Sequence, residues 1–391
     1  MTLLETVRPR YGVGSLADVL PGALALLGVP GAADALGLAA RAGPVRRVAV
    51  LLVDGLGSRT LPLAAPHSPV LADALAGRLG TLTELTSGFP STTPTSLASI
   101  GTGAGPGEHG LIGFTVNVPG TTRVLNHINW WGDPDPLAWQ PVTTQFERAA
   151  AAGVAVTVVN RPEFAGSGLS VSAYRGATHA DAPDLPALAH EMLAALAAAD
   201  GPALVYGYHP NVDRDGHLYG VDSPEWHAAV AGLDTLLDRL VAGLPPDAVL
   251  LVTADHGQLN IPPGSRFDLA ADPRLRSGVR VVAGEPRVRY LHVEPGAAGD
   301  VIATWRAVLG GAAWVASREE AVAAGWFGPV REEHLSRVGD VVVACHDRYA
   351  VLSTGTEPEV ISRLVAYHGS YTAAEMLVPL WSVPGNVGGG G

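Results

Sequence analysis

The 391-residue sequence contains no lysine and only one cysteine, Cys345. The absence of lysine excludes mechanisms that form a Schiff base on lysine or hold phosphate with a P-loop lysine. A single cysteine cannot form a disulfide framework or a cysteine-based zinc site. Charged residues make up only 16%, and 25 basic side chains face 37 acidic ones, which gives a net charge of −12. We therefore expect no binding of a nucleic-acid polymer, which depends on broad neutralisation of phosphates.

Long uninterrupted hydrophobic runs are also missing. The apolar stretch at residues 20–40 is broken by Pro21, Pro30 and Asp34, so it fits neither a secretory signal nor a membrane span of about 20 apolar residues. We expect a cytoplasmic protein without membrane association, while the sequence leaves its oligomeric state open. Hydrophobic residues nevertheless reach 47%, which is enough to build a large core and excludes disorder for most of the chain.

Short apolar runs alternate with helical patterns along the chain. Four runs predict strands buried on both faces, at residues 47–54, 154–160, 203–208 and 248–254. Three segments between them have the length and spacing of helices, at residues 141–153, 184–200 and 223–243. This alternation predicts an α/β fold with a central, mainly parallel sheet sandwiched by helices. Catalytic side chains of such folds gather beyond the carboxyl ends of the strands.

The pattern changes near residue 259. A strand-like segment at 278–293 is followed by a helical segment at 298–309 and a further stretch at 312–326. We interpret residues 259–340 as a smaller α+β insertion into a main catalytic domain formed by residues 1–258 and 341–384. The glycine-rich residues 385–391 predict a disordered tail.

Acidic residues and histidines follow the predicted strands. Asp54-Gly55 ends the first strand, an Asp-x-x-x-His motif follows the third, and Asp-His-Gly ends the fourth. A late His-Gly adds one more imidazole. The three carboxylates and three imidazoles are Asp54, Asp213, His217, Asp255, His256 and His368. Six such ligands without thiolate suit two divalent cations, with Zn²⁺ favoured and Mn²⁺ or iron as alternatives.

A candidate nucleophile lies in a hydroxyl-rich segment at residues 91–99. Pro94 favours the first helical position, which places Thr93 as the N-cap of the helix that follows. A hydroxyl there lies in the positive field of the helix N-terminus, among free backbone N–H groups that can hold phosphate. The alternative interpretation is a simple capping cluster.

These motifs, in their order, resemble the alkaline phosphatase superfamily, in particular its type I phosphodiesterase / nucleotide pyrophosphatase family. The family combines a strand ending in Asp-Gly, a Phe-Pro-Ser-x-Thr segment running into Thr-Gly and His-Gly, Asp-x-x-x-His, Asp-His-Gly and a late His-Gly. The corresponding residues are Asp54-Gly55, Phe89-Pro90-Ser91-Thr92-Thr93, Thr102-Gly103, His109-Gly110, Asp213 with His217, Asp255-His256-Gly257 and His368-Gly369.

The resemblance implies a metal-dependent phosphoryl hydrolase with an alkaline-phosphatase-like fold. The implied cation sites are formed by Asp213, His217 and His368 and by Asp54, Asp255 and His256. Thr93 would be the nucleophile and form a phosphothreonine intermediate, with Thr92 as the alternative. The expected activity is that of a phosphodiesterase or nucleotide pyrophosphatase on a small-molecule phosphate ester. A phosphomonoesterase or phosphonate hydrolase is the alternative, and a non-catalytic binding homologue is a further one.

The substrate contacts are less defined by the motifs. Diesterase members of the family carry Asn three residues after the nucleophile, where this sequence has Ser96, so Asn117 or Asn126 is an alternative contact to phosphate. Candidate aromatic contacts to a planar group are Trp130, Trp131 and Tyr208. Arg175 and Arg214 are candidates for gripping a second phosphate.

Overall fold

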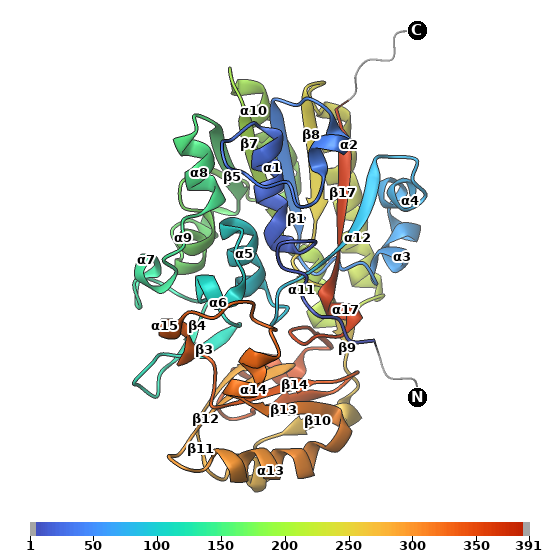
Figure 1. Cartoon of the computed structure of the whole chain (residues 1–391). Helices are drawn as coiled ribbons and strands as arrows, with labels where there is room; N and C mark the ends of the chain where they lie inside the picture. The colour runs from blue at the N-terminus through green and yellow to red at the C-terminus, as the bar shows by residue number, and fades with distance from the viewer. Residues whose placement is uncertain (1–4, 386–391) are drawn as a thin grey trace.

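A seven-stranded sheet forms the centre of the structure, a computed structural model that describes residues 5–385 (Figure 1). In spatial order its strands are β2 (Thr81–Thr86), β17 (Leu377–Pro384), β8 (Ala248–Thr253), β1 (Arg47–Val53), β7 (Ala203–His209), β5 (Ala155–Asn160) and β6 (Thr178–Asp181). The four predicted strands correspond to β1, β5, β7 and β8, which are parallel. The sequence analysis missed β17, which runs antiparallel to both β8 and β2.

Helices cover both faces of this sheet, as the α/β prediction requires. The helices of the main domain are α1 (Val19–Leu26), α2 (Leu38–Ala42), α3 (Leu61–Ala64), α4 (Pro69–Leu75), α5 (Thr93–Thr102), α6 (Pro106–His109), α7 (Pro136–Trp139), α8 (Gln145–Ala151), α9 (Gly168–Tyr174), α10 (Leu185–Ala198), α11 (Asn211–Tyr219), α12 (Pro224–Gly243) and α17 (Ala373–Met376). α10 packs on β5, β7 and α12, whereas α5 packs with α1, α8 and α9 in the other layer (Figure 1). None of the helices within residues 5–385 is both long and apolar enough to cross a lipid bilayer.

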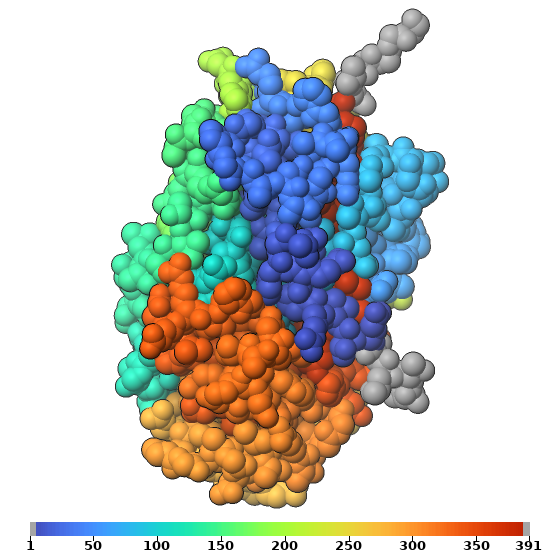
Figure 2. All heavy atoms as spheres, viewed as in Figure 1, coloured from blue at the N-terminus to red at the C-terminus, as the bar shows by residue number. Residues whose placement is uncertain are grey.

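A smaller unit lies at the carboxyl-end side of the main sheet and forms the orange lower end of the molecule in Figure 2. Its four-stranded antiparallel sheet has the order β11 (Val279–Glu285), β12 (Val288–Val293), β14 (Val341–Cys345) and β13 (Ala313–Ser317). β10 (Arg266–Asp268) pairs with β15 (Ala350–Leu352), and β9 (Leu259–Asn260) pairs with β16 (Ala366–Tyr367). The remaining elements near this unit are the hairpin β3 (Thr115–Asn117) and β4 (Val124–Asn126), and the helices α13 (Ala298–Leu309), α14 (Arg318–Ala323), α15 (Glu332–Leu335) and α16 (Glu359–Arg363).

The observed unit differs from the predicted insertion in two respects. The segment 278–293 is a hairpin of β11 and β12 rather than one strand, because Pro286 and Arg287 form its turn. The small sheet also continues past residue 340, since β14 is hydrogen bonded between β12 and β13. Apart from Gly385, the predicted tail lies outside the described residues.

Helix α5 lies close to α9 at a glycine. A Cβ added to Gly101 would lie 2.1 Å from the carbonyl oxygen of Ala173 on α9, so only glycine allows the two backbones to approach this far. All ten residues of α5 are buried. This contact therefore fixes the distance between α9 and α5, the helix whose first residue is the candidate nucleophile Thr93.

We predict that Gly101→Ala lowers the free energy of unfolding by about 2 kcal/mol, because the added methyl group forces α5 and α9 apart. Gly299→Ala is the matched control, since Gly299 is also helical and has nothing within 4 Å of an added Cβ. Urea denaturation of both variants checks the prediction. Equal midpoints for Gly101→Ala and the wild-type protein would contradict it.

Candidate active site

Three neighbouring parallel strands deliver the predicted carboxylates to one place. Asp54 follows β1, Asp255 follows β8, and Asp213 lies in the first turn of α11, directly after β7. β1 pairs with both β7 and β8, so the three carboxyl ends are adjacent. Gly55 has φ of 75°, and a Cβ there would lie 2.8 Å from the Cβ of Asp213. Glycine at position 55 therefore permits both the left-handed turn after β1 and the close approach of α11.

The first ligand group consists of Asp213, His217 and His368, whose ligand atoms lie within 4.8 Å of one another. Asp213 and His217 are four residues apart on α11, so they lie on one face of the helix. His217 Nδ1 lies 2.7 Å from the carbonyl oxygen of Ala366, and His368 Nδ1 lies 2.9 Å from that of Ser91. Each Nδ1–H donates to a carbonyl, which leaves both Nε2 atoms unprotonated and available as ligands.

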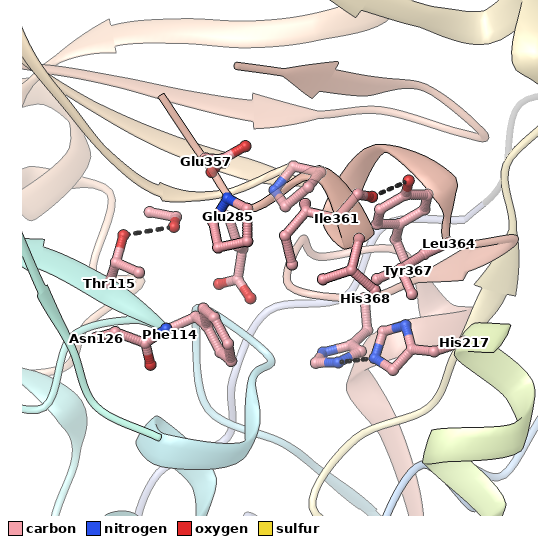
Figure 3. Close-up of a pocket in the computed structure, with 14 residues that line it drawn as sticks. Phe114, Thr115, Asn126, His217, Glu285, Glu357, Ile361, Leu364, Tyr367 and His368 are labelled. Atoms are coloured by element: carbon pink, nitrogen blue, oxygen red, sulfur yellow. Dashed lines mark hydrogen bonds between the residues drawn. The ribbon is translucent and has the colours of Figure 1, made fainter. Parts of the chain in front are cut away.

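The two Nε2 atoms are only 3.1 Å apart, as the dashed line between His217 and His368 in Figure 3 shows. In this tautomer two nitrogen lone pairs face each other and cannot hydrogen bond. A cation bound between the imidazoles and the Asp213 carboxylate would satisfy both. The chemistry of the donor set therefore fits a divalent cation of the zinc type.

The second ligand group consists of Asp54, Asp213 and His256. His256 Nε2 lies 3.5 Å from Asp54 Oδ1 and 3.2 Å from Asp255 Oδ2. Asp54 Oδ1 and Asp255 Oδ2 are buried oxygens without a hydrogen-bond partner in the described part of the chain. Unsatisfied buried carboxylate oxygens are costly, and their convergence on one imidazole nitrogen is the arrangement that a second cation would satisfy. Asp213 belongs to both groups, and Asp255, which the sequence predicted as a ligand of the second cation, lies beside His256.

Neighbouring side chains orient these ligands. The hydroxyl of Tyr208 donates to Asp54 Oδ2, and Gln258 Nε2 donates to Asp213 Oδ1 over 2.8 Å. The sequence analysis assigned Tyr208 to substrate stacking and did not single out Gln258. The position of Gln258, directly after Asp-His-Gly, is the signal that could have identified it.

Burial and mutual repulsion shift the pKa values of the ligands. Burial, with the charges of Asp255 and Asp213, raises the pKa of Asp54 well above its usual range. Burial also raises the pKa of Asp255. Burial and the neighbouring His256 and His217 lower the pKa of His368 well below its usual range. These shifts indicate that the side chains of the site do not balance their own charges. Bound divalent cations would lower the pKa values of the carboxylates again.

Thr93 lies at the second ligand group. Its Oγ1 is 3.2 Å from His256 Nε2, and the residue is 8% exposed. The structure differs from the prediction that Thr93 is the N-cap. Thr92 is the N-cap, with extended backbone angles, and Thr93 is the first residue of α5, with Pro94 in its first turn. The shift by one residue still leaves the Thr93 hydroxyl in the first turn, beside the free N–H groups of the helix.

The candidate substrate contacts divide into two groups. Trp130 is only 1% exposed, packs closely on Gly168 and donates its indole N–H to Pro134. It is therefore a core residue and not the stacking platform that the sequence suggested. Trp131 is 61% exposed and lines a cavity of about 130 Å³ together with Thr93, Tyr208 and Phe164.

Most of the polar side chains predicted to contact substrate already form hydrogen bonds or ion pairs within the protein. Ser96 donates its hydroxyl to the carbonyl oxygen of Asp255, and the Asn117 amide donates to backbone carbonyls of the β3–β4 hairpin. Arg175 is held by Glu147, and Arg214 is held by Asp215. These four side chains are therefore not presented to a phosphate in this arrangement.

A second cavity, of about 270 Å³, opens beside the first ligand group. Figure 3 shows Asn126, Phe114 and Glu285 around it, with His217 and His368 at one edge. Burial raises the pKa of Glu285 to about 8. The sequence contained no signal for Glu285, because the residue comes from the smaller unit and no motif surrounds it.

Solved structures of other proteins share this architecture. Murine ectonucleotide pyrophosphatase / phosphodiesterase 5, solved as an inactive variant with a threonine replaced by alanine and in complex with AMP, matches with a TM-score of 0.68 and 17% sequence identity over 86% of this chain and 87% of that chain. Phosphonoacetate hydrolase from Sinorhizobium meliloti 1021, in complex with phosphonoacetate, matches with a TM-score of 0.65 and 18% identity over 88% of this chain and 92% of that chain. These likenesses confirm the predicted alkaline-phosphatase-like fold.

The sequence itself also has relatives. An uncharacterized pyrophosphatase/phosphodiesterase of Schizosaccharomyces pombe is 26% identical over 180 residues, which cover 43% of this chain and only 36% of that relative. Residues 48–371 match the type I phosphodiesterase / nucleotide pyrophosphatase family. The chain thus belongs to the type I phosphodiesterase / nucleotide pyrophosphatase family.

Proposed function

We propose that the protein is a phosphodiesterase of the nucleotide pyrophosphatase type that acts through a phosphothreonine on Thr93 and depends on two divalent cations, with Zn²⁺ favoured. The observation that carries this proposal is the contact between Thr93 Oγ1 and His256 Nε2, at 3.2 Å. This contact brings a hydroxyl at a helix N-terminus to the edge of a largely buried group of three carboxylates and three imidazoles. A cytoplasmic location remains a prediction from the sequence.

The residues divide the chemistry between them. Asp213, His217 and His368 would hold one cation, and Asp54, Asp255 and His256 would hold the second. When bound, the two cations would stabilise the Thr93 alkoxide and the charge that develops on the leaving oxygen.

Thr93 Oγ1 attacks phosphorus in line as the bond between phosphorus and the leaving oxygen breaks. The free N–H groups at the start of α5 can donate to the non-bridging oxygens. A water molecule then attacks the phosphothreonine, which releases the product and returns the hydroxyl to Thr93. No lysine or cysteine is required, in agreement with the composition.

The cavity beside Thr93 supports a diester rather than a simple monoester. It is lined by Trp131, Phe164 and Tyr208, and the rings of Phe164 and Tyr208 meet edge to face. Aromatic walls favour a planar group on the part of the substrate that stays attached to phosphorus. The related murine structure holds AMP, which is consistent with a nucleoside in such a place. Phosphonate hydrolysis is the second candidate, because the Sinorhizobium neighbour is a phosphonoacetate hydrolase.

Thr93→Ala is expected to lower turnover of a nitrophenyl phosphodiester by about 10³-fold or more, because the covalent nucleophile is lost. Thr92→Ala is the matched control, since Thr92 also has a buried hydroxyl and stands one residue before α5. Steady-state kinetics of both purified variants checks the assignment. Wild-type turnover by Thr93→Ala, or loss of turnover only in Thr92→Ala, would overturn it.

Removal of divalent cations is expected to abolish activity, because the buried carboxylates alone repel both phosphate and the threonine alkoxide. Dialysis against a chelator, followed by addition of single metal salts and an activity assay, tests this expectation. Zn²⁺ should restore turnover better than Mn²⁺ or Fe²⁺. Full activity with no metal detected by elemental analysis would rule out the two-cation mechanism.

Tyr208→Phe is expected to weaken Zn²⁺ binding by about 10- to 100-fold, because Asp54 loses the hydroxyl that orients it. Tyr174→Phe is the control, since Tyr174 lines the same cavity and its buried hydroxyl has no hydrogen-bond partner in the described residues. Competition titration against a fluorescent chelator measures the affinity. An unchanged affinity in Tyr208→Phe would contradict a positioning role for Tyr208.

A further inference from the structure

The cavity of about 270 Å³ beside the first ligand group lies between the main domain and the smaller unit. Its walls come from the β3–β4 region, from the turn between β11 and β12, and from residues 357–364. Two of its lining residues, His217 and His368, are candidate cation ligands. The cavity is therefore continuous with the site of chemistry (Figure 3).

The lining of this cavity is mainly apolar. Its hydrophobic lining residues include Phe114, Pro286, Pro358, Ile361 and Leu364. No arginine belongs to the described lining, and the sequence has no lysine. Apart from the two ligand imidazoles, no basic side chain of residues 5–385 lines this space.

Among the described lining residues, Glu285 and Glu357 are the only acidic ones. Arg289 pairs with Glu357 through both of its terminal nitrogens and is itself only 1% exposed, so the charge of Glu357 is already balanced. Glu285 is 5% exposed, and its Oε1 has no hydrogen-bond partner in the described part of the chain. Figure 3 shows its carboxyl group pointing into the cavity. Glu285 is thus an unpartnered acidic group of the lining, beside the amide of Asn126.

The position of the cavity indicates which part of the substrate it would bind. Thr93 contacts His256 of the second ligand group, whereas the cavity is bordered by His217 and His368 of the first. In-line displacement places the leaving oxygen opposite the attacking oxygen. The group that departs from phosphorus therefore lies toward this cavity, and the retained group lies toward the aromatic cavity at Thr93.

We propose that this cavity binds the leaving group of the ester and selects an uncharged, apolar alcohol or phenol over pyrophosphate or another phosphate-bearing group. The proposal rests on the two-cation, Thr93-dependent diesterase proposed above and narrows its substrate class. A phosphate-bearing leaving group would lose its hydration in an apolar space without a basic partner, which costs binding energy. An apolar leaving group gains from burial, and a hydroxyl or ether on it can pair with Glu285.

Two substrates that differ only in the leaving group test the proposal. The p-nitrophenyl ester of thymidine 5′-monophosphate releases nitrophenol, and thymidine 5′-triphosphate releases pyrophosphate, while both leave the same thymidine monophosphate on the enzyme. We expect kcat/KM for the aryl ester to exceed that for the triphosphate in the wild-type protein. Because nitrophenol is also an intrinsically good leaving group, the decisive measurement is how this ratio changes in a variant.

Val360→Arg places a cation at the rim of the cavity. Val360 lines the cavity and is 52% exposed, so the variant should fold. It is expected to lower the ratio of aryl ester to triphosphate kcat/KM by about three-fold, the effect of a partly exposed charge pair. Leu137→Arg is the matched control, because Leu137 is 54% exposed, is not among the residues lining the cavity, and receives the same charge. Its ratio should equal that of the wild-type protein.

The outcomes separate the two proposals. A triphosphate kcat/KM equal to or above that of the aryl ester, with turnover still lost in Thr93→Ala, would overturn the leaving-group assignment and leave the diesterase intact. A ratio unchanged in Val360→Arg would also overturn it. Absence of Thr93-dependent cleavage of either substrate would overturn the proposed diesterase itself, and the leaving-group assignment with it.

Discussion

Uncompensated charge at the carboxyl end of the central sheet is the constraint on which the rest of the site depends. Asp54, Asp213 and Asp255 converge with the imidazoles, and no arginine within residues 5–385 forms an ion pair with any of them. Such a group is unfavourable on its own, because desolvation and like charges act together. Two divalent cations would turn the local charge from negative to positive. An acidic protein without lysine would thereby gain a cationic centre for phosphate.

The surrounding structure holds this unfavourable group in place. The backbone carbonyls of Ala366 and Ser91 fix the tautomers of His217 and His368, and Tyr208 and Gln258 orient two carboxylates. These contacts come from strands, helices and loops far apart in the sequence. The free energy gained from the hydrophobic core therefore offsets the cost of holding these metal-coordinating atoms close together before any cation binds.

Much of the fold and of the ligand set could be predicted from local patterns. The apolar runs that became β1, β5, β7 and β8 are uniform and long enough to identify, and carboxylates at their ends follow from the geometry of parallel sheets. The N-cap was misplaced because Thr92 and Thr93 have the same side chain, and only the backbone angles of Thr92 distinguish them. Burial of Trp130 and the reach of Glu285 into the site depend on packing between distant segments, which a single sequence does not encode locally.

A buried ion pair joins the smaller unit to the main domain. Arg287, in the turn between β11 and β12, donates to both oxygens of Glu375 over 2.8 Å, and both side chains are fully buried. Removing either partner of such a pair leaves a buried charge and is strongly unfavourable. Pro286 lies in the same turn and Glu285 ends β11 directly before it, so the pair also fixes one wall of the large cavity. The shape that a substrate meets therefore exists before binding, and little ordering entropy has to be spent when the substrate enters.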